Sequence, residues 1–254
     1  MEDVNLLEIL LSAAFGAIFG SYATLFAYRL PLKESCFGRY FGKKSRCPKC
    51  EAIIKTRDLI PVLNWLFTLG RCRNCGVMIP RTHLFIELAT TILFIICYLK
   101  FSFSEEFIIY SLISVSCIIL LVTNFTHKVF PQALLIFLLF LVVVNRILLD
   151  QSIFDLIYSG ILGVLCSAIF YYIFYKNGKN LFANQEQTFD YLKFILIASL
   201  ALSQINFILF FLIIVTNFLV LLLFKMVESS RKYGFGYVFI FPFYLLLLFP
   251  VLTI

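Results

Sequence analysis

The chain has 254 residues, of which 62% are hydrophobic and 14% charged, and its formal net charge is +7. Such a composition excludes a water-soluble globular protein of this length, because too few polar side chains are present to cover its outside. The sequence therefore predicts an integral membrane protein.

Eight apolar segments have about the length that a helix needs to cross a bilayer, roughly 17–25 residues. They lie at residues 6–28, 83–99, 107–123, 129–149, 153–175, 190–204, 206–224 and 235–253. We expect an all-α polytopic membrane protein with about eight transmembrane helices, or seven, because the sixth segment is short. The first segment follows Glu2 and Asp3 rather than basic residues, and is too long for an ordinary signal peptide, so we expect it to stay in the protein.

A long polar stretch between the first two segments, residues 32–82, holds 11 Lys and Arg residues against three acids. Basic loops of membrane proteins stay on the cytoplasmic side. We therefore place this loop in the cytoplasm and both chain ends outside. Because this orientation in the membrane accounts for the basic charge of the loop, we expect membrane lipid as the partner and no nucleic acid.

Two Cys-x-x-Cys pairs lie in this loop, Cys47 with Cys50 and Cys72 with Cys75, with 21 residues between the pairs. Thiols on the cytoplasmic side stay reduced, and two such pairs supply four thiolates to a tetrahedral zinc ion. Four thiolates leave no open coordination position, so we predict a structural Zn²⁺ in a zinc-ribbon-like loop. A redox pair, or a loop that no longer binds metal, is the alternative.

The residues around these pairs resemble the amino-terminal cysteine-rich domain of the bacterial type IV prepilin leader peptidase/N-methyltransferase family. The similar motifs are residues 20–31, 45–48 (SRCP), 58–66 (DLIPVLNWL), 70–76 (GRCRNCG) and Glu87. The resemblance is strong over residues 16–90 and weak beyond residue 120. It implies a prepilin-peptidase-like domain over 1–105, followed by a membrane aspartic-peptidase-like helical domain over 106–254.

The resemblance also implies an activity. Enzymes of this family cut the leaders of prepilins and pseudopilins at the cytoplasmic face of the bacterial inner membrane. Many then methylate the new amino terminus with S-adenosylmethionine. Two aspartates embedded in the membrane make the cut. Prepilin-like substrates, S-adenosylmethionine and an inner-membrane location are thus what the family implies for this chain.

Other residues occupy both aspartate positions here. In the family the first aspartate lies seven residues before a proline, and the residue seven before Pro131 is Asn124. The second belongs to a G-x-G-D-x-K-like motif, and alignment on Lys193 puts Tyr191 in its place. Asp190 is displaced by one residue, which turns a helical side chain by about 100°. Because the chemistry needs two carboxyl groups that share a proton, we predict a degenerate peptidase.

A rearranged acid pair of Asp190 and Glu87 is the main alternative. Glu87 fits the family's own glutamate, and acids inside a membrane are often functional, although helix pairing would also explain it. Asp155 begins a helix on the outside, where the helix dipole favours an acid. His127 is expected in an interfacial loop and His83 at the entry to its helix. A methyltransferase without peptidase activity, or a non-enzymatic assembly protein of a pilus-like, secretion or DNA-uptake system, are the remaining alternatives.

Overall fold

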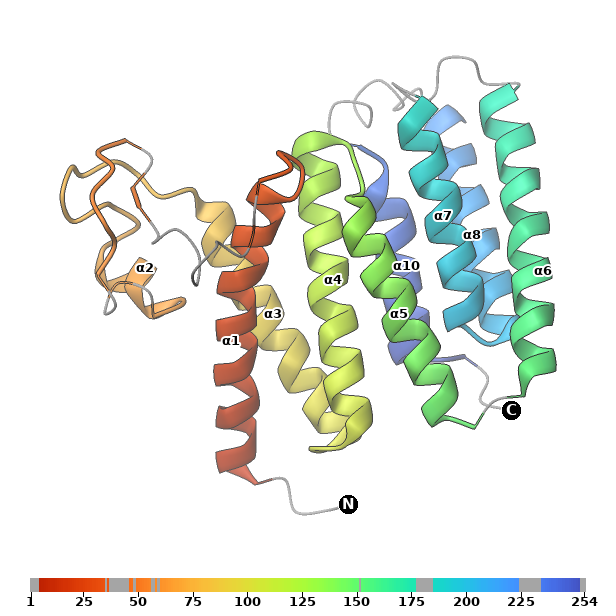
Figure 1. Cartoon of the computed structure of the whole chain (residues 1–254), viewed down its shortest axis with the longest axis horizontal. Helices are drawn as coiled ribbons and strands as arrows, with labels where there is room; N and C mark the ends of the chain where they lie inside the picture. Colours follow the sequence, from red (N-terminus) through yellow and green to blue (C-terminus); the bar gives the residue numbers. More distant parts are fainter. Residues whose placement is uncertain are drawn as a thin grey trace. The chain divides into compact units, whose positions relative to one another are not determined.

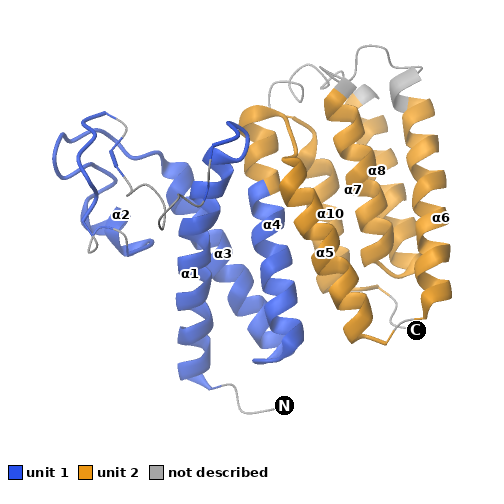
Figure 2. Cartoon of the chain, viewed as in Figure 1, with its two compact units in different colours: residues 1–119 blue, residues 120–254 orange. Residues whose placement is uncertain are grey.

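The computed structural model describes residues 5–34, 36, 46–47, 49–55, 58, 60–150, 152–176, 185–223 and 234–251. Within these ranges the regular elements are all helices, and the β-structure consists of two isolated bridges. The chain divides into two compact units, Met1–Ile119 and Leu120–Ile254 (Figure 2). The predicted all-α architecture is confirmed.

Unit 1 is built on two long helices, α1 (Leu6–Arg29) and α3 (Arg81–Phe101), which pack side by side (Figure 1). The loop between them carries the short helix α2 (Leu63–Phe67). Helix α4 (Glu105–His127) begins in unit 1, and its last residues, from Leu120 onward, belong to unit 2.

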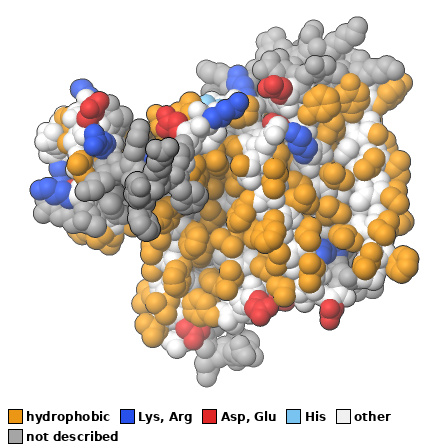
Figure 3. Space-filling model, viewed as in Figure 1, with side chains coloured by type: hydrophobic (Ala, Val, Ile, Leu, Met, Phe, Trp, Pro, Cys, Tyr) orange, Lys and Arg blue, Asp and Glu red, His pale blue; other side chains and the backbone are white. Residues whose placement is uncertain are grey.

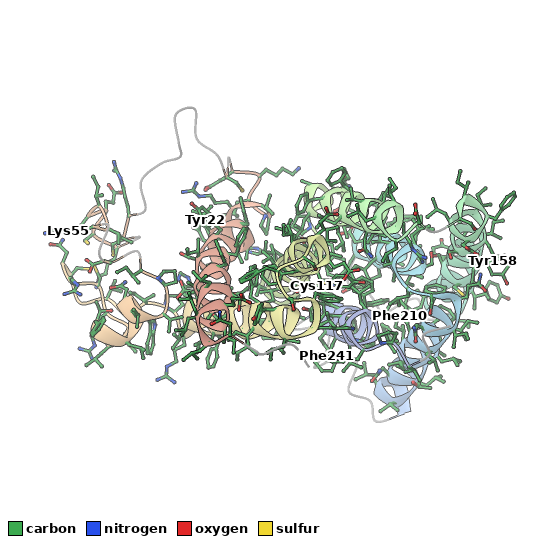
Figure 4. All side chains as sticks on the ribbon, turned by 90° about the horizontal axis from the view of Figure 1, so that it is seen from below. Tyr22, Lys55, Cys117, Tyr158, Phe210 and Phe241 are labelled. Carbon is green, nitrogen blue, oxygen red and sulfur yellow. The ribbon has the colours of Figure 1, made fainter. Side chains whose placement is uncertain are left out.

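Unit 2 is arranged around α7, which contacts α5, α6, α8 and α10. The helices are α5 (Gln132–Leu148), α6 (Ile153–Phe170) with the π-helical turn η2 (Tyr171–Lys176), α7 (Gln185–Ala201), α8 (Gln204–Leu223) and α10 (Gly236–Leu248). Phenylalanine rings fill the core, with Phe210 fully buried among the helices and Tyr158 exposed at their edge (Figure 4). Ring-to-ring contacts join these helices, as between Phe194 and Phe243, whose centroids are 5.2 Å apart.

Five of the described helices are long and apolar enough to cross a membrane. They are Leu6–Arg29, Arg81–Phe101, Glu105–His127, Ile153–Ile173 and Gln204–Leu221, while Gln132–Leu148 and Gly236–Leu248 are apolar but shorter. Large apolar side chains cover much of the visible surface (Figure 3), which only a lipid environment accommodates. Each of the eight expected segments overlaps one of α1, α3, α4, α5, α6, α7, α8 and α10. How many of these helices cross the bilayer completely remains a prediction.

Small residues let α1 and α3 approach closely. The buried face of α1 consists of Ser12, Gly16, Gly20, Ala23 and Ala27. A Cβ atom on Gly20 would overlap the Thr90 hydroxyl and come within 2.8 Å of the Glu87 Cα. Membrane helices commonly pack in this way, because small side chains bring the backbones into van der Waals contact.

We expect Gly20→Leu to separate α1 from α3 and to lower the free energy of unfolding by about 2–3 kcal/mol, the usual cost of overpacking. Thermal unfolding of the purified protein in detergent measures the effect. Ala14→Leu is the matched control, because it adds the same side chain to an exposed position of the same helix. Equal unfolding temperatures for the two variants would contradict the close packing.

Candidate functional site

The four cysteines of the two Cys-x-x-Cys pairs come together in unit 1. The sulfur atoms of Cys47, Cys50, Cys72 and Cys75 all lie within 4.8 Å of one another. The Sγ atoms of Cys47 and Cys75 are 3.7 Å apart. Four sulfurs at 2.3 Å from a tetrahedral zinc ion are separated by about 3.8 Å, so the cluster fits a metal ion such as zinc. Three residues of the surrounding motifs, 45, 48 and 59, lie outside the described residues.

Each cysteine pair is held by its own backbone turn, and the two turns are of the same type. In the first turn the Cys47 N–H donates to the Ala52 carbonyl at 3.0 Å, and the Glu51 N–H donates to the Cys47 carbonyl at 2.9 Å. The same two bonds recur 25 residues later in Cys72, Gly76 and Val77, and a β-bridge closes each turn, Arg46 with Ile53 and Arg71 with Met78. The site is therefore built from two copies of one metal-binding knuckle.

Sequence reasoning missed this repeat, although the segments RCPKCEAII (46–54) and RCRNCGVMI (71–79) carry a visible signal of it. Gly76 of the second knuckle has a φ of 70°, in the left-handed region that glycine tolerates. The equivalent residue of the first knuckle is Glu51, at φ 54°. One knuckle therefore has the residue that the turn prefers, and the other does not.

Hydrogen bonds prepare some of the thiols for metal binding. The Asn74 amide donates to Cys50 Sγ at 3.4 Å, and this bond, together with the backbone of Ala52, lowers the pKa of the Cys50 thiol to about 6. Backbone groups of Cys75 and Asn74 lower the pKa of Cys72. The backbone of Val77 acts in the same direction on Cys75, but desolvation and the other three sulfurs raise its pKa to about 11. Four thiolates so close together therefore need a cation to hold them all in the charged form.

Glu87 lies in the second turn of α3, where it holds the cysteine-rich loop. Its Oε2 accepts a hydrogen bond from the Val62 N–H at 2.7 Å. Val62 precedes α2 and has φ 61°, which is unusual for a β-branched residue. The contact shows that Glu87 positions this strained turn. A catalytic role for Glu87 remains a prediction.

Asn124 and Tyr191 meet in the buried interior of unit 2. The Asn124 Nδ2 donates to the Tyr191 hydroxyl at 3.1 Å, although the two residues are 67 positions apart in the sequence. The Asn124 Oδ1 accepts the Gly236 N–H at 2.7 Å. A Cβ on Gly236 would lie 2.7 Å from the Asn124 Cγ, so the start of α10 can approach this closely only with glycine.

The Tyr191 hydroxyl is the centre of a larger network. It accepts hydrogen bonds from Asn124, from the Gln187 side chain at 2.9 Å and from the Phe235 N–H at 3.1 Å. Its ring stacks on Phe239 with centroids 4.6 Å apart. The network links the end of α4, the start of α7 and the start of α10. It contains an amide and a phenol at the two positions that the sequence predicts to correspond to the family's aspartates.

Asp190 directly precedes Tyr191 in the sequence and is also buried, but its side chain has different hydrogen-bond partners. Its Oδ2 accepts the Phe130 N–H at 3.3 Å, and its Oδ1 pairs with the Lys193 ammonium at 3.3 Å. These contacts hold the turn between α4 and α5 against α7. Asp190 belongs to unit 2 and Glu87 to unit 1. That they form an acid pair remains a prediction.

The other titratable residues singled out from the sequence lie at helix ends. Asp155 is in the first turn of α6, where the Ser152 hydroxyl donates to its carboxylate at 2.7 Å and accepts its N–H. His83 is in the first turn of α3, and His127 is the last residue of α4. Both histidines are exposed. The structure thus places Asp155 and His83 at helix starts, as expected. The expected loop position of His127 is wrong, because α4 continues through this residue.

Comparison with known proteins identifies relatives of the chain. Residues 14–101 match the family described as the bacterial peptidase A24 N-terminal domain. A prepilin leader peptidase/N-methyltransferase of Bacillus subtilis is 31% identical over 156 residues, which cover 61% of this chain and 60% of the relative. The protein of the same name from Myxococcus xanthus is 32% identical over 120 residues, or 47% and 34% of the two chains. A type 4 prepilin-like proteins leader peptide-processing enzyme of Escherichia coli is 27% identical over 136 residues, or 48% and 51%.

The matched part covers between about a third and three fifths of a relative's length, depending on the relative. No solved structure gives a significant match to the chain.

Proposed function

Because this chain belongs to the family of the prepilin leader peptidase/N-methyltransferases, we propose that it binds prepilin-like proteins at the bacterial inner membrane without cutting their leaders. The hydrogen-bonded pair of Asn124 and Tyr191 carries this proposal. Motif resemblance assigns these two residues to the aspartate positions, and their side chains lie 3.1 Å apart. The two positions of a catalytic pair must face the same buried interior, and this contact supports that arrangement.

The chemistry of this pair supports loss of the peptidase step. In aspartic proteolysis one carboxylate accepts a proton from water while its protonated partner donates to the substrate carbonyl. An amide such as Asn124 cannot act as that base, and a phenol such as Tyr191, with an ordinary pKa of about 10, stays neutral at pH 7. Both side chains are also engaged in holding α4, α7 and α10 together.

The proposed arrangement in the membrane follows from the charge of the loop. We place the cysteine-rich loop in the cytoplasm, where a zinc ion held by the four thiolates would stabilise its fold. A prepilin leader is short and basic by family resemblance and would be met from the same side. The substrate helix would then lie in the bilayer beside the apolar helices.

A cleavage assay tests the proposal. The purified protein in lipid, incubated with a prepilin-type substrate, is expected to leave it uncut, at least about 10⁴-fold slower than the Bacillus subtilis relative on the same substrate, the scale on which loss of catalytic groups acts. The substrate is nevertheless expected to co-purify with the protein.

Two outcomes would overturn this expectation. Cleavage that disappears in Asp190→Asn and Glu87→Gln variants would establish the rearranged acid pair instead. Absence of both cleavage and co-purification would reject binding of prepilin-like proteins.

Methyl transfer is a second candidate function, favoured by the match of residues 14–101 to the family and by the methyltransferase activity in the relatives' names. It would move a methyl group from S-adenosylmethionine to the amino terminus of an already cut substrate. Calorimetric titration with S-adenosylmethionine and transfer of a labelled methyl group to such a substrate test it. Failure to bind the cofactor would leave a non-enzymatic role in assembly of a pilus-like, secretion or DNA-uptake system.

A further inference from the structure

The cysteine-rich loop exposes large apolar side chains that are not part of the four-cysteine cluster. In and beside α2 these are Ile60, Leu63, Leu66, Phe67 and Leu69. Phe67 is 76% exposed and Leu69 79% exposed. A contiguous exposed apolar patch outside a membrane span usually marks a surface that meets lipid or another protein.

The contact between Val62 and Glu87 places this patch beside the second turn of α3. Glu87 is six residues after Arg81, the first residue of α3, which places it about 9 Å along the helix. Its carboxylate is 2.7 Å from the backbone nitrogen of Val62, directly before α2. The interfacial zone on each side of a bilayer is about 5–8 Å thick. With Arg81 at the headgroup level, α2 would begin near the boundary between that zone and the hydrocarbon core. In Figure 1, α2 lies on the flank of unit 1, lower than the end of α1.

Basic residues accompany the apolar patch. Arg71 follows two residues after Leu69, Arg81 begins α3, and both are exposed. Lys55 lies at the outer edge of the loop (Figure 4). Figure 3 shows hydrophobic atoms along the lower edge of this lobe and Lys and Arg side chains above them. An apolar edge bordered by positive charge is typical of segments that lie in the interface of an anionic membrane.

We propose that residues 60–69 form an interfacial membrane anchor for the cysteine-rich loop. The apolar side chains of α2 and the following turn enter the outer part of the bilayer, and Arg71 and Arg81 contact anionic lipid headgroups. The anchor holds the four-cysteine cluster against the membrane surface instead of leaving the loop free in water. This inference does not depend on the proposed function.

Trp65 provides the test, because it is the one tryptophan of the chain and lies within α2. The full-length, zinc-loaded protein is placed in bilayers of phosphatidylcholine and phosphatidylglycerol, with or without bromine near the interfacial end of the acyl chains. Bromine quenches a tryptophan that it contacts. We expect Trp65 to lose most of its emission in brominated lipid. Equal emission in brominated and ordinary lipid would overturn the proposal and indicate that the patch faces water or a protein partner.

Two variants and one change of lipid refine the result. Phe67→Ser combined with Leu69→Ser is expected to restore much of the emission, and unchanged zinc content would show that the loop is still folded. Met78→Ser, at an exposed apolar position of the same loop outside the anchor, is the matched control and should leave quenching unchanged. Quenching that the double variant keeps in full would reject these side chains as the anchor.

Replacing phosphatidylglycerol by phosphatidylcholine should weaken the quenching, and no change would reject the role of the arginines.

Discussion

Tyr191→Phe is expected to lower the free energy of unfolding by about 3–5 kcal/mol. The substitution removes one oxygen atom and leaves the ring stacked on Phe239. Three buried donors, on Asn124, Gln187 and Phe235, then lose their acceptor. A buried donor without a partner costs about 1–3 kcal/mol. The total expected loss is smaller than three full penalties, because the amide side chains of Asn124 and Gln187 can rotate toward other acceptors.

Chemical unfolding of the purified protein in detergent measures this loss. Tyr158→Phe is the matched control, because Tyr158 is 54% exposed on α6, and exposed substitutions usually change stability by less than about 0.5 kcal/mol. If both variants unfold at the same denaturant concentration, the hydroxyl of Tyr191 does not hold the network together. A large loss only for Tyr191→Phe would show that the position has become structural.

Most of the helices could be predicted because a segment in lipid must satisfy its backbone hydrogen bonds internally. A long apolar run therefore has almost no choice but to be a helix. The segment predicted at 190–204 is the exception, since α7 begins five residues earlier, at Gln185. Gln187 and Thr188 are polar yet buried. The hydrogen bond from Gln187 to the Tyr191 hydroxyl accounts for the burial of Gln187, and hydropathy along the sequence does not reveal it.

The candidate sites were predictable to different degrees. The cysteine cluster follows from local spacing, because each pair is made within one turn. Motif alignment located Asn124 and Tyr191, but their hydrogen bond depends on backbone groups of Phe235 and Gly236 far along the chain. Both are backbone N–H groups, which every non-proline residue has, so the amino-acid type at these positions does not reveal the hydrogen bonds. The role of Glu87 in holding Val62 was hidden for the same reason, since the partner is a backbone N–H.

Cys72→Ser is expected to abolish tight zinc binding and to unfold the cysteine-rich loop. The predicted site uses four thiolates, and a structural zinc ion contributes on the order of 10 kcal/mol to the folding of a small domain. Both knuckles would share that ion, so removal of one ligand is expected to release the other knuckle as well. Metal analysis of the purified protein should give about one zinc per chain before the substitution and almost none after it.

Cys36→Ser is the matched control, because Cys36 lies in the same loop but outside the cluster, with its sulfur 3.9 Å from the Glu34 carbonyl. It should keep its zinc and resist proteases as the unaltered chain does. The close packing of α1 on α3 occurs at Gly16 and Gly20, which are not part of the cysteine cluster. We therefore expect Cys72→Ser to open the loop to cleavage while the helices remain folded. Equal zinc content in the two variants would contradict the four-cysteine site. Loss of the helices together with the loop would show instead that the metal cluster supports the whole of unit 1.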